Sequence, residues 1–329
     1  MKHLQPADDF PASFIVGSER SGTTLLATLI DRHPEIAVPP ETHFFVNTRK
    51  RSFDPYPEGK RADLMKNVTE GRRMKEAGIP VSELSARFSQ YPADLRHLFQ
   101  AALETYAQTH NKRICAEKTP SHLFHVNRIL ECYPKARFIY IFRDGRDVVA
   151  SLLKMPWRKN DSERRLIDYW TRCMELGFEY DNRLPDQWLN IQYETLVQNP
   201  EATLGRVMRF IGLEFVPSQL VPADPAAIES PRKKVWWHMA VTKEIDASQV
   251  QKWRAADPAV VYLRTRLMRR QLVRAGYTVQ LDALPTPGRR FSLGIKALLW
   301  KTLSAPQALN RGRTKLTPKT ALSSKCLAT

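Results

Sequence analysis

Long apolar runs are missing from this sequence of 329 residues. No stretch of about 18 uninterrupted apolar residues occurs, so we expect no membrane-spanning helix. Residues 1–9 contain no apolar core of the kind that a secretory signal peptide has, so we expect no such signal. No internal repeat is visible, which disfavours a solenoid or a propeller.

Cysteine is also scarce. The four cysteines, Cys115, Cys132, Cys173 and Cys326, form no CxxC pair and no metal-ligand spacing. A disulfide framework or a zinc site is therefore disfavoured, and no carboxylate cluster is typical of a magnesium site, so we expect no bound metal. The simplest location for such a chain is the reducing cytoplasm.

Positive charge is abundant and unevenly spread. The chain has 51 Lys and Arg against 34 Asp and Glu, a net charge of +17. Residues 261–329 hold 14 of the basic residues and a single acid, Asp282, which gives +13 and leaves +4 for residues 1–260. We expect one folded domain over 1–285, which is nearly balanced in charge up to residue 260, and a basic, partly disordered extension over 286–329.

An apolar stripe accompanies this basic extension. One face of a helix there would carry Phe291, Ile295, Leu298, Leu299 and Thr302. Such a helix favours docking on an anionic membrane surface, and the protein would then be cytoplasmic and membrane-peripheral. The alternative is a solvated tail that packs one apolar turn on the body.

The most informative pattern is residues 17–24, GSERSGTT. It follows an apolar, β-branched run at 14–16 and precedes a helix-like segment at 25–32. Strand, small-residue turn and helix is the layout of a phosphate-binding loop. The glycine spacing matches a Walker A loop, but Thr23 stands where that loop needs lysine. The loop therefore favours a nucleotide with fewer 5′ charges than ATP, with Arg20 placed to meet it.

A second segment could hold another phosphate of the same nucleotide. Residues 136–142 are apolar, aromatic and β-branched, which predicts a buried parallel strand. Arg143 follows at its carboxyl end, where open α/β sheets bind ligands. Asp144 is a candidate N-cap for the next helix, and Ser151 lies two turns into that helix.

These patterns predict an α/β fold, a P-loop-like parallel sheet with helices on both faces. The expected strands are 13–17, 35–38, 113–117, 136–143 and 187–192. The expected helices are 22–33, 60–77, 92–110, 121–132, 145–154, 161–182, 194–198, 200–212 and 258–275. Residues 46–112 form a helical insert in this scheme, and residues 216–250 are rich in loops.

The motifs resemble those of sulfotransferases that use 3′-phosphoadenosine 5′-phosphosulfate (PAPS), over roughly residues 10–275. Residues 20–24 are similar to the family's 5′-phosphosulfate loop, and Arg143 with Ser151 to its 3′-phosphate site. Residues 40–45, PETHFF, resemble the segment that carries the catalytic glutamate in tyrosylprotein and heparan-type sulfotransferases.

Three further segments extend the resemblance. Residues 117–120, EKTP, resemble the family's lysine-bearing turn, and later family landmarks resemble residues 193–196 and 252–254. Golgi members of the family are membrane-anchored and lumenal, which the expected cytoplasmic location does not match.

The resemblance implies a sulfuryl transfer from PAPS to an acceptor hydroxyl. Glu41 would be the base that takes the hydroxyl proton, and the cations Arg20 and Lys118 would stabilise the departing phosphate. The implied nucleotide-binding residues are Arg20, Ser21, Gly22, Thr23, Thr24, Arg143, Ser151 and Tyr193. No metal is required, because fixed cations can neutralise the transferring group.

Several alternatives stay open. His43 and His122 are other candidate bases, because soluble hormone-type sulfotransferases use histidine. An ATP-dependent P-loop kinase is disfavoured by Thr23, and a non-catalytic basic protein that binds membrane or nucleic acid is supported only by the C-terminal charge. We expect no nucleic-acid partner. The acceptor could be a carbohydrate, a peptide tyrosine or a lipid or small-molecule alcohol. Residues 236–238, Trp-Trp-His, are either core or an aromatic wall.

Overall fold

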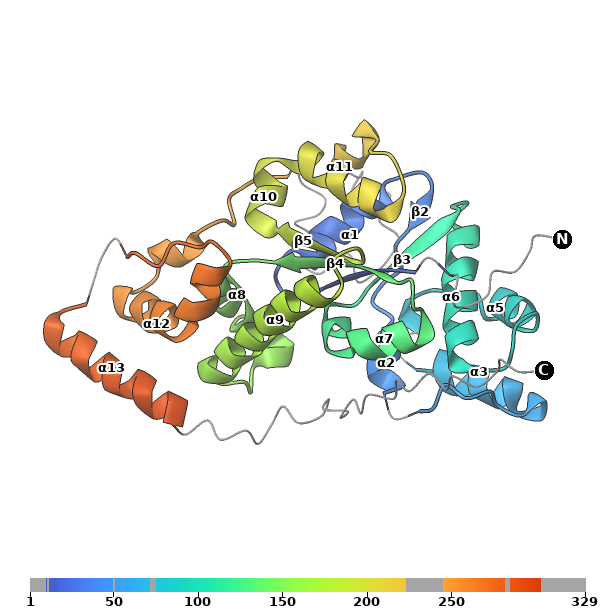
Figure 1. The fold of residues 1–329 in the computed structure, drawn as a ribbon, viewed down its shortest axis with the longest axis horizontal. Coiled ribbons are helices and arrows are strands. Elements are labelled where there is room, and N and C mark those ends of the chain that lie inside the picture. Colours follow the sequence, from blue (N-terminus) through green and yellow to red (C-terminus); the bar gives the residue numbers. More distant parts are fainter. Residues whose placement is uncertain are drawn as a thin grey trace, which may run out of the picture.

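A five-stranded sheet forms the centre of the protein (Figure 1). The computed structural model describes residues 10, 12–49, 51–71, 75–222, 245–281 and 285–302. The strands are β1 (Ser13–Gly17), β2 (Ile36–Ala37), β3 (Ile114–Lys118), β4 (Arg137–Phe142) and β5 (Trp188–Gln192). Their order is β2-β3-β1-β4-β5, and every neighbouring pair is parallel. All five carboxyl ends therefore lie at one edge of the sheet, which confirms the predicted fold class.

The two central strands are built from apolar and aromatic residues that alternate between the faces. In β1, Phe14 contacts one core cluster with Phe138 of β4, while Ile15 packs in a second cluster with Ile139. Both faces of the sheet are thus covered, as expected for a parallel sheet. β1 ends at Gly17, where a Cβ would overlap the carbonyl oxygen of Ile141 on β4.

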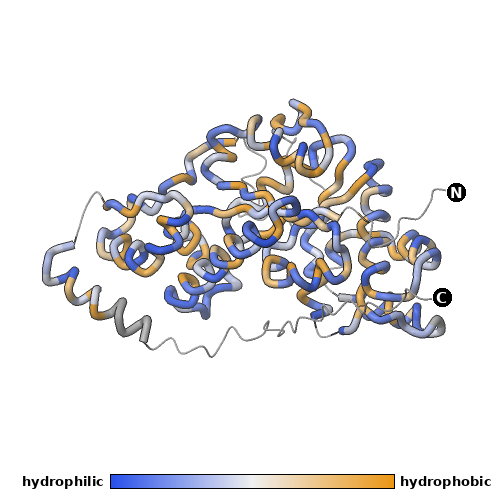
Figure 2. Tube along the Cα trace, in the orientation of Figure 1, coloured by the Kyte–Doolittle hydropathy of each residue, from blue (hydrophilic) through white to orange (hydrophobic). Residues whose placement is uncertain are grey.

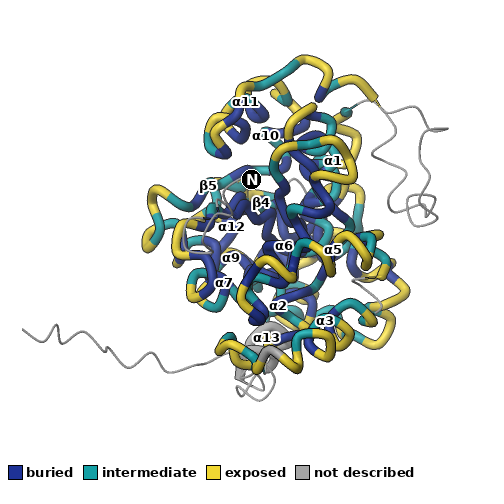
Figure 3. Tube along the Cα trace, turned by 90° about the vertical axis from the view of Figure 1, so that its right-hand side faces the viewer, coloured by how far each residue is buried: buried dark blue, intermediate teal, exposed yellow. Residues whose placement is uncertain are grey.

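Helices cover each face and bury one side of themselves against the sheet. Along the helices, hydrophobic and hydrophilic stretches alternate in Figure 2, and the buried stretches gather around the sheet in Figure 3. One face carries α1 (Thr23–Asp31), α10 (Tyr193–Gln198) and α11 (Pro200–Ile211). The other carries α6 (Leu95–Thr109), α7 (Val126–Cys132) and α9 (Glu163–Arg183).

A third apolar cluster joins α8 (Gly145–Leu152) and α9 to α12 (Pro258–Arg274). Met268 of α12 packs there beside Trp170 of α9, both fully buried. α13 (Pro287–Thr302) follows and extends along the edge of the molecule (Figure 1). No helix in the described part of the chain is long and apolar enough to cross a membrane.

The helical insert differs in detail from the prediction. It contains α2 (Phe44–Asn47), α3 (Arg61–Thr69), α5 (Val81–Phe88) and α6. The helix predicted over 60–77 is described only as α3, and α5 lies between the predicted helices 60–77 and 92–110. Proline is tolerated at a helix start, where its missing N–H needs no partner, and Pro80 is the N-cap of α5.

The remaining helical turns are short 3₁₀ segments at loops. They are η2 (Glu58–Lys60), η3 (Pro120–His125), η4 (Pro156–Arg158), η5 (Pro217–Leu220) and η9 (Lys252–Ala255). The predicted helix 121–132 is in fact η3 followed by α7. Residues 303–329 and the Trp-Trp-His segment at 236–238 lie outside the described residues.

Candidate functional site

The loop between β1 and α1 has the geometry of an anion site. Its two tight positions, Arg20 and Gly22, have φ angles of 67° and 95°, and α1 begins directly afterwards at Thr23. Only glycine fits at position 22, because a Cβ there would overlap the ring of Tyr193. The start of α1 therefore faces the site, where free N–H groups and the helix dipole attract anions.

Four predicted nucleotide-binding residues, which come from the segments that follow β1, β4 and β5, lie together beside this turn. Arg20 Nε donates to Ser151 Oγ at 3.0 Å, and Arg143 Nη1 donates to the carbonyl oxygen of Arg20 at 3.4 Å. The Arg143 guanidinium stacks 4.5 Å above the Tyr193 ring. The predicted 5′ and 3′ groups are therefore parts of one cluster.

The electrostatics of this cluster fit an anionic ligand. Burial and the nearby charge of Arg143 lower the pKa of Arg20, because each disfavours a second positive charge at this place. Ser21 Oγ and Arg143 Nε are buried and have no hydrogen-bond partner among the described residues. A phosphate beside them would offset the repulsion and supply both missing partners.

A second layer of contacts fixes Arg143 and was only partly visible in the sequence. Asp144 caps α8 by accepting from the Arg146 N–H at 2.9 Å, as predicted. Asp147 Oδ1 accepts from the backbone N–H of Trp253 at 2.8 Å, and the Arg146 guanidinium stacks 3.6 Å from the Trp253 ring. Residues 252–254 thus contact the first turn of α8, directly after Arg143 in the chain.

Arg143 also has two partners of its own that were not predicted. Its Nη2 lies 3.6 Å from Asp147 Oδ2 and donates to the carbonyl oxygen of Gln249. Gln249 lies 106 residues from Arg143 in the sequence, so no local spacing could predict this contact.

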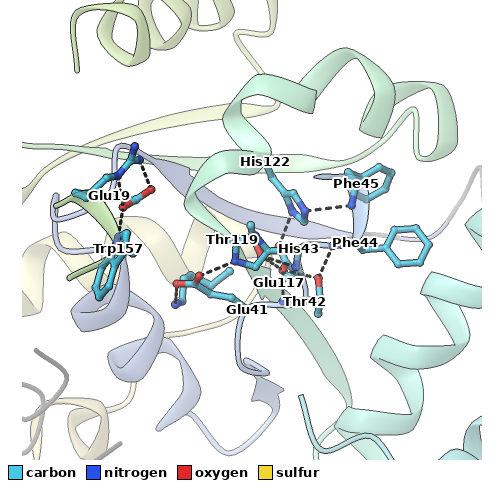
Figure 4. A network of polar contacts seen from close by, with 12 residues as sticks. Glu19, Glu41, Thr42, His43, Phe44, Phe45, Glu117, Thr119, His122 and Trp157 are labelled. Carbon is cyan, nitrogen blue, oxygen red and sulfur yellow. Dashed lines mark hydrogen bonds and ion pairs between the residues drawn. The ribbon is translucent and has the colours of Figure 1, made fainter. Parts of the chain in front are cut away.

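The predicted base lies between two nitrogen donors. Glu41 Oε1 accepts from Lys118 Nζ at 2.6 Å, and Glu41 Oε2 lies 3.0 Å from His43 Nε2 (Figure 4). Burial raises the pKa of Glu41, but the charge of Lys118 and the hydrogen bonds from His43 and Lys118 outweigh it and hold the pKa well below its ordinary value. Glu41 is therefore an ionised carboxylate at neutral pH.

A fully buried carboxylate, Glu117, holds this arrangement in place. Its Oε1 accepts from the hydroxyls of Thr42 at 2.8 Å and Thr119 at 2.6 Å, and from the Thr42 N–H at 3.3 Å. Its Oε2 lies 2.8 Å from His122 Nδ1 (Figure 4). Glu117 therefore ties the loop that carries Glu41 to the turn that follows Lys118. The motif EKTP contained Glu117, but nothing in the sequence gave it this role.

The two histidines that are alternative bases, His43 and His122, have different surroundings. His122 is fully buried, with Nδ1 on Glu117 and Nε2 accepting from the Phe45 N–H at 3.3 Å. Both ring nitrogens are engaged inside the protein, so His122 does not face an acceptor. His43 is partly exposed and contacts Glu41, and it remains a candidate proton relay.

Within the described ranges, no group of three or more His, Cys, Asp and Glu side chains is arranged to hold a metal ion.

Known proteins resemble this chain in sequence. Residues 11–217, more than half of the chain, match the model of the sulfotransferase family. A protein-tyrosine sulfotransferase of Drosophila melanogaster is 28% identical over 215 residues, or 63% of this chain. The matched part is only 39% of that relative. Protein-tyrosine sulfotransferase 1 of Danio rerio is 25% identical over 278 residues, covering 82% of this chain and 73% of the relative.

A solved structure shares the fold. The sulfotransferase domain of the Synechococcus PCC 7002 olefin synthase superposes with a TM-score of 0.58 and 21% identity, covering 84% of this chain and 98% of that domain.

Proposed function

The chain belongs to the sulfotransferase family, and we propose that it transfers a sulfuryl group from PAPS to the hydroxyl oxygen of an acceptor. One observation carries the proposal. Glu41, a carboxylate whose pKa is held below its ordinary value, and the buried Lys118 lie at the same sheet edge as the loop that carries Arg20. A base and fixed cations at one edge are what a metal-free group transfer between oxygens requires.

The nucleotide would be held by the loop residues at both of its charged ends. Backbone N–H groups from Ser21 to Thr24 and the Arg20 guanidinium would bind the 5′ end. Arg143 and Ser151 would bind the 3′-phosphate, with Tyr193 packed beneath Arg143. The buried Ser21 hydroxyl and Arg143 Nε, which have no partner among the described residues, support this assignment.

PAPS supplies an activated sulfuryl group whose S–O bond to phosphate breaks during transfer. Glu41 would take the proton of the acceptor hydroxyl as the acceptor oxygen forms its bond to sulfur. The electron pair of the broken bond stays on the phosphate oxygen, where Arg20 and Lys118 would stabilise the new charge. His43 would orient the Glu41 carboxylate through its contact at 3.0 Å. The products are a sulfate ester and adenosine 3′,5′-bisphosphate.

The acceptor class is a hydroxyl compound. Peptide tyrosine is supported by the names of the Drosophila and Danio relatives. Carbohydrate and lipid or small-molecule alcohols are the other outcomes of an acceptor screen.

We also propose a cytoplasmic, membrane-peripheral location. Phe291 and Ile295 of α13, four residues apart, are 73% and 45% exposed, and they form an apolar stripe beside a strongly basic segment. Each Lys or Arg near an anionic surface contributes about 1 kcal/mol. The chain and a Phe291→Ser/Ile295→Ser variant can be sedimented with phosphatidylserine vesicles, beside a version that ends at residue 284. If all three pellet equally at low salt, α13 is not the docking element.

Nucleotide binding and transfer test the central proposal together. Adenosine 3′,5′-bisphosphate should raise the melting temperature, whereas ATP with magnesium should not, because Thr23 replaces the Walker lysine. Labelled PAPS should deliver its sulfuryl group to a hydroxyl acceptor, and transfer should continue in EDTA. Stabilisation by ATP with magnesium alone would favour the kinase alternative, and no response to either nucleotide would favour a non-catalytic protein.

A further inference from the structure

The chain turns back toward the sheet at the end of α12. Gly276 has a φ angle of 78°, and the N–H of Tyr277 donates to the carbonyl oxygen of Leu272 at 2.9 Å, which closes the helix. The Tyr277 ring then lies 6.4 Å from the Phe142 ring, edge to face at 83°. Phe142 is the last residue of β4 and directly precedes Arg143. Tyr277 therefore reaches the strand end that carries the proposed 3′-phosphate arginine.

Glu194 connects Tyr277 to the backbone beside Arg143. Its Oε2 accepts from the Tyr277 hydroxyl at 2.9 Å, and its Oε1 accepts from the Asp144 N–H at 3.1 Å. Glu194 also directly follows Tyr193, the residue whose ring stacks against the Arg143 guanidinium. One carboxylate thus links the turn after α12 to the peptide that follows Arg143 and to the ring on which Arg143 stacks. Hydrogen bonds to a charged acceptor are about twice as strong as neutral ones.

The same turn makes a second contact with the start of α8. The carbonyl oxygen of Thr278 accepts from Arg146 Nη2 at 2.9 Å. The Arg146 guanidinium also donates to both carboxylate oxygens of Asp144, at 3.0 and 2.6 Å. A two-point arginine–carboxylate contact is geometrically specific. The residues on both sides of Arg143 are therefore held by the turn after α12.

These contacts bring a late part of the chain to the nucleotide cluster. The match to the family model ends at residue 217, whereas Tyr277 lies beyond it. We propose that Tyr277 and Glu194 are positioning residues that aim Arg143 at the 3′-phosphate of the nucleotide. The inference rests on the proposed function and adds two residues to its nucleotide site.

The charge of Glu194 by itself would have the opposite effect. A carboxylate so close to Arg143 repels a phosphate bound there, so an effect of charge alone would make Glu194→Gln bind the nucleotide more tightly. A positioning role predicts weaker binding. The amide of Glu194→Gln keeps an acceptor for only one of the two donors, Asp144 N–H and the Tyr277 hydroxyl, and that bond becomes neutral. The direction of the change separates the two roles.

Tyr277→Phe is the cleaner test, because it removes one hydroxyl and keeps both the ring and the net charge. By calorimetry, we expect the affinity for adenosine 3′,5′-bisphosphate to fall about 2- to 12-fold, as for one lost hydrogen bond. The affinity for adenosine 5′-monophosphate, which lacks the 3′-phosphate, should not change. Tyr262→Phe on α12 is the matched control, since its hydroxyl accepts only an exposed contact from Arg266 at 3.4 Å. It should alter neither affinity.

Two further measurements exclude a general loosening of the fold. Glu194→Gln should also weaken adenosine 3′,5′-bisphosphate, and the double variant with Tyr277→Phe should lose less than the two single losses combined, because both act on one hydrogen bond. With labelled PAPS, Tyr277→Phe should raise the KM for PAPS and leave kcat nearly unchanged, because Glu41 and Lys118 lie on other loops.

The outcomes separate this inference from the proposed function. The inference is wrong if Tyr277→Phe binds adenosine 3′,5′-bisphosphate like the wild type, if adenosine 5′-monophosphate loses as much affinity, or if Glu194→Gln binds more tightly. Selective loss of 3′-phosphate affinity in a protein that transfers no sulfuryl group to any acceptor would sink the sulfotransferase proposal and leave the positioning role standing. Sulfuryl transfer with a KM for PAPS that is indifferent to Tyr277→Phe would do the reverse.

Discussion

Replacing Glu117 by glutamine tests whether the buried carboxylate positions Glu41 and Lys118, the proposed base and cation. Glu117 accepts from three side chains, and the amide of Glu117→Gln would keep one acceptor oxygen and gain a donor. If the amide nitrogen faces His122, the Nδ1–H is opposed. If His122 changes tautomer, its Nε2–H opposes the Phe45 N–H that now donates to it. One buried donor is left without a partner in either case.

The cost of that donor sets the expected size of the effect. An unsatisfied buried polar group costs about 1–3 kcal/mol, and each kcal/mol lowers the melting temperature of a domain of this size by about 2–4 °C. We therefore expect Glu117→Gln to melt about 2–12 °C below the wild type. Loosening the Glu41 loop should lower turnover about 10- to 100-fold, because small misplacements of a catalytic group are costly. Affinity for adenosine 3′,5′-bisphosphate should be nearly unchanged, since Arg20 and Arg143 lie on other loops.

Glu35→Gln is the matched control. Glu35 forms an exposed ion pair with Arg113 at 2.7 Å, and such pairs contribute at most about 1 kcal/mol. Thermal unfolding, calorimetry and PAPS turnover are measured on both variants. The reasoning is refuted if Glu117→Gln melts like Glu35→Gln, or if its nucleotide affinity falls as far as its turnover.

Three other outcomes follow from the same geometry. Glu41→Gln should retain nucleotide affinity and lower turnover by roughly 10²–10⁴; near-normal turnover would point to His43 as the base. Arg143→Ala should weaken adenosine 3′,5′-bisphosphate at least about tenfold and leave adenosine 5′-monophosphate nearly unaffected, and calorimetry showing equal wild-type affinity for both would contradict the 3′-phosphate site. The pKa values of Glu41 and Glu117 are both lowered, so each carboxylate contributes stability above about pH 4.3 that is lost as pH falls further. Between about pH 6 and 3, the melting temperature of Glu41→Gln should therefore fall less steeply than that of the wild type.

The sheet and the cluster of Arg20, Arg143 and Ser151 were predictable because local sequence carries their signals. Short apolar strands each run into a polar turn, and parallel topology brings all of those turns to one edge. This is why Arg20, Arg143 and Ser151, far apart in sequence, could be placed together, and Arg20 and Ser151 are within hydrogen-bond distance.

The supporting contacts were not predictable, because they depend on packing between distant segments. Glu117 meets Thr42 across 75 residues, and Glu19 meets Trp157 across 138. Neither pair has a characteristic spacing, and an acidic side chain usually remains solvated. Only the folded arrangement distinguishes Glu117, fully buried, from the exposed Glu35.

The depressed pKa of Glu41 creates a requirement for catalysis. A base works best when its pKa lies near the working pH. The charge of Lys118, whose Nζ lies 2.6 Å from Glu41 Oε1, opposes protonation of Glu41 and lowers its pKa. Each pKa unit corresponds to about 1.36 kcal/mol of lost proton affinity. Lys118 is also the cation proposed to stabilise the departing phosphate. If the Lys118 ammonium moved from Glu41 toward the phosphate of PAPS, the pKa of Glu41 would rise and the departing phosphate would gain a contact in the same step.

Replacing Lys118 by alanine tests this coupling. Burial raises the pKa of Glu41 once the opposing charge is gone, and a base must be deprotonated to act. The acid limb of kcat/KM for the acceptor, measured with saturating PAPS, should therefore move to higher pH in Lys118→Ala. Its turnover should also fall, because the departing phosphate loses a cation. If turnover falls while the acid limb stays where it is in the wild type, Lys118 acts on the phosphate alone and does not tune Glu41.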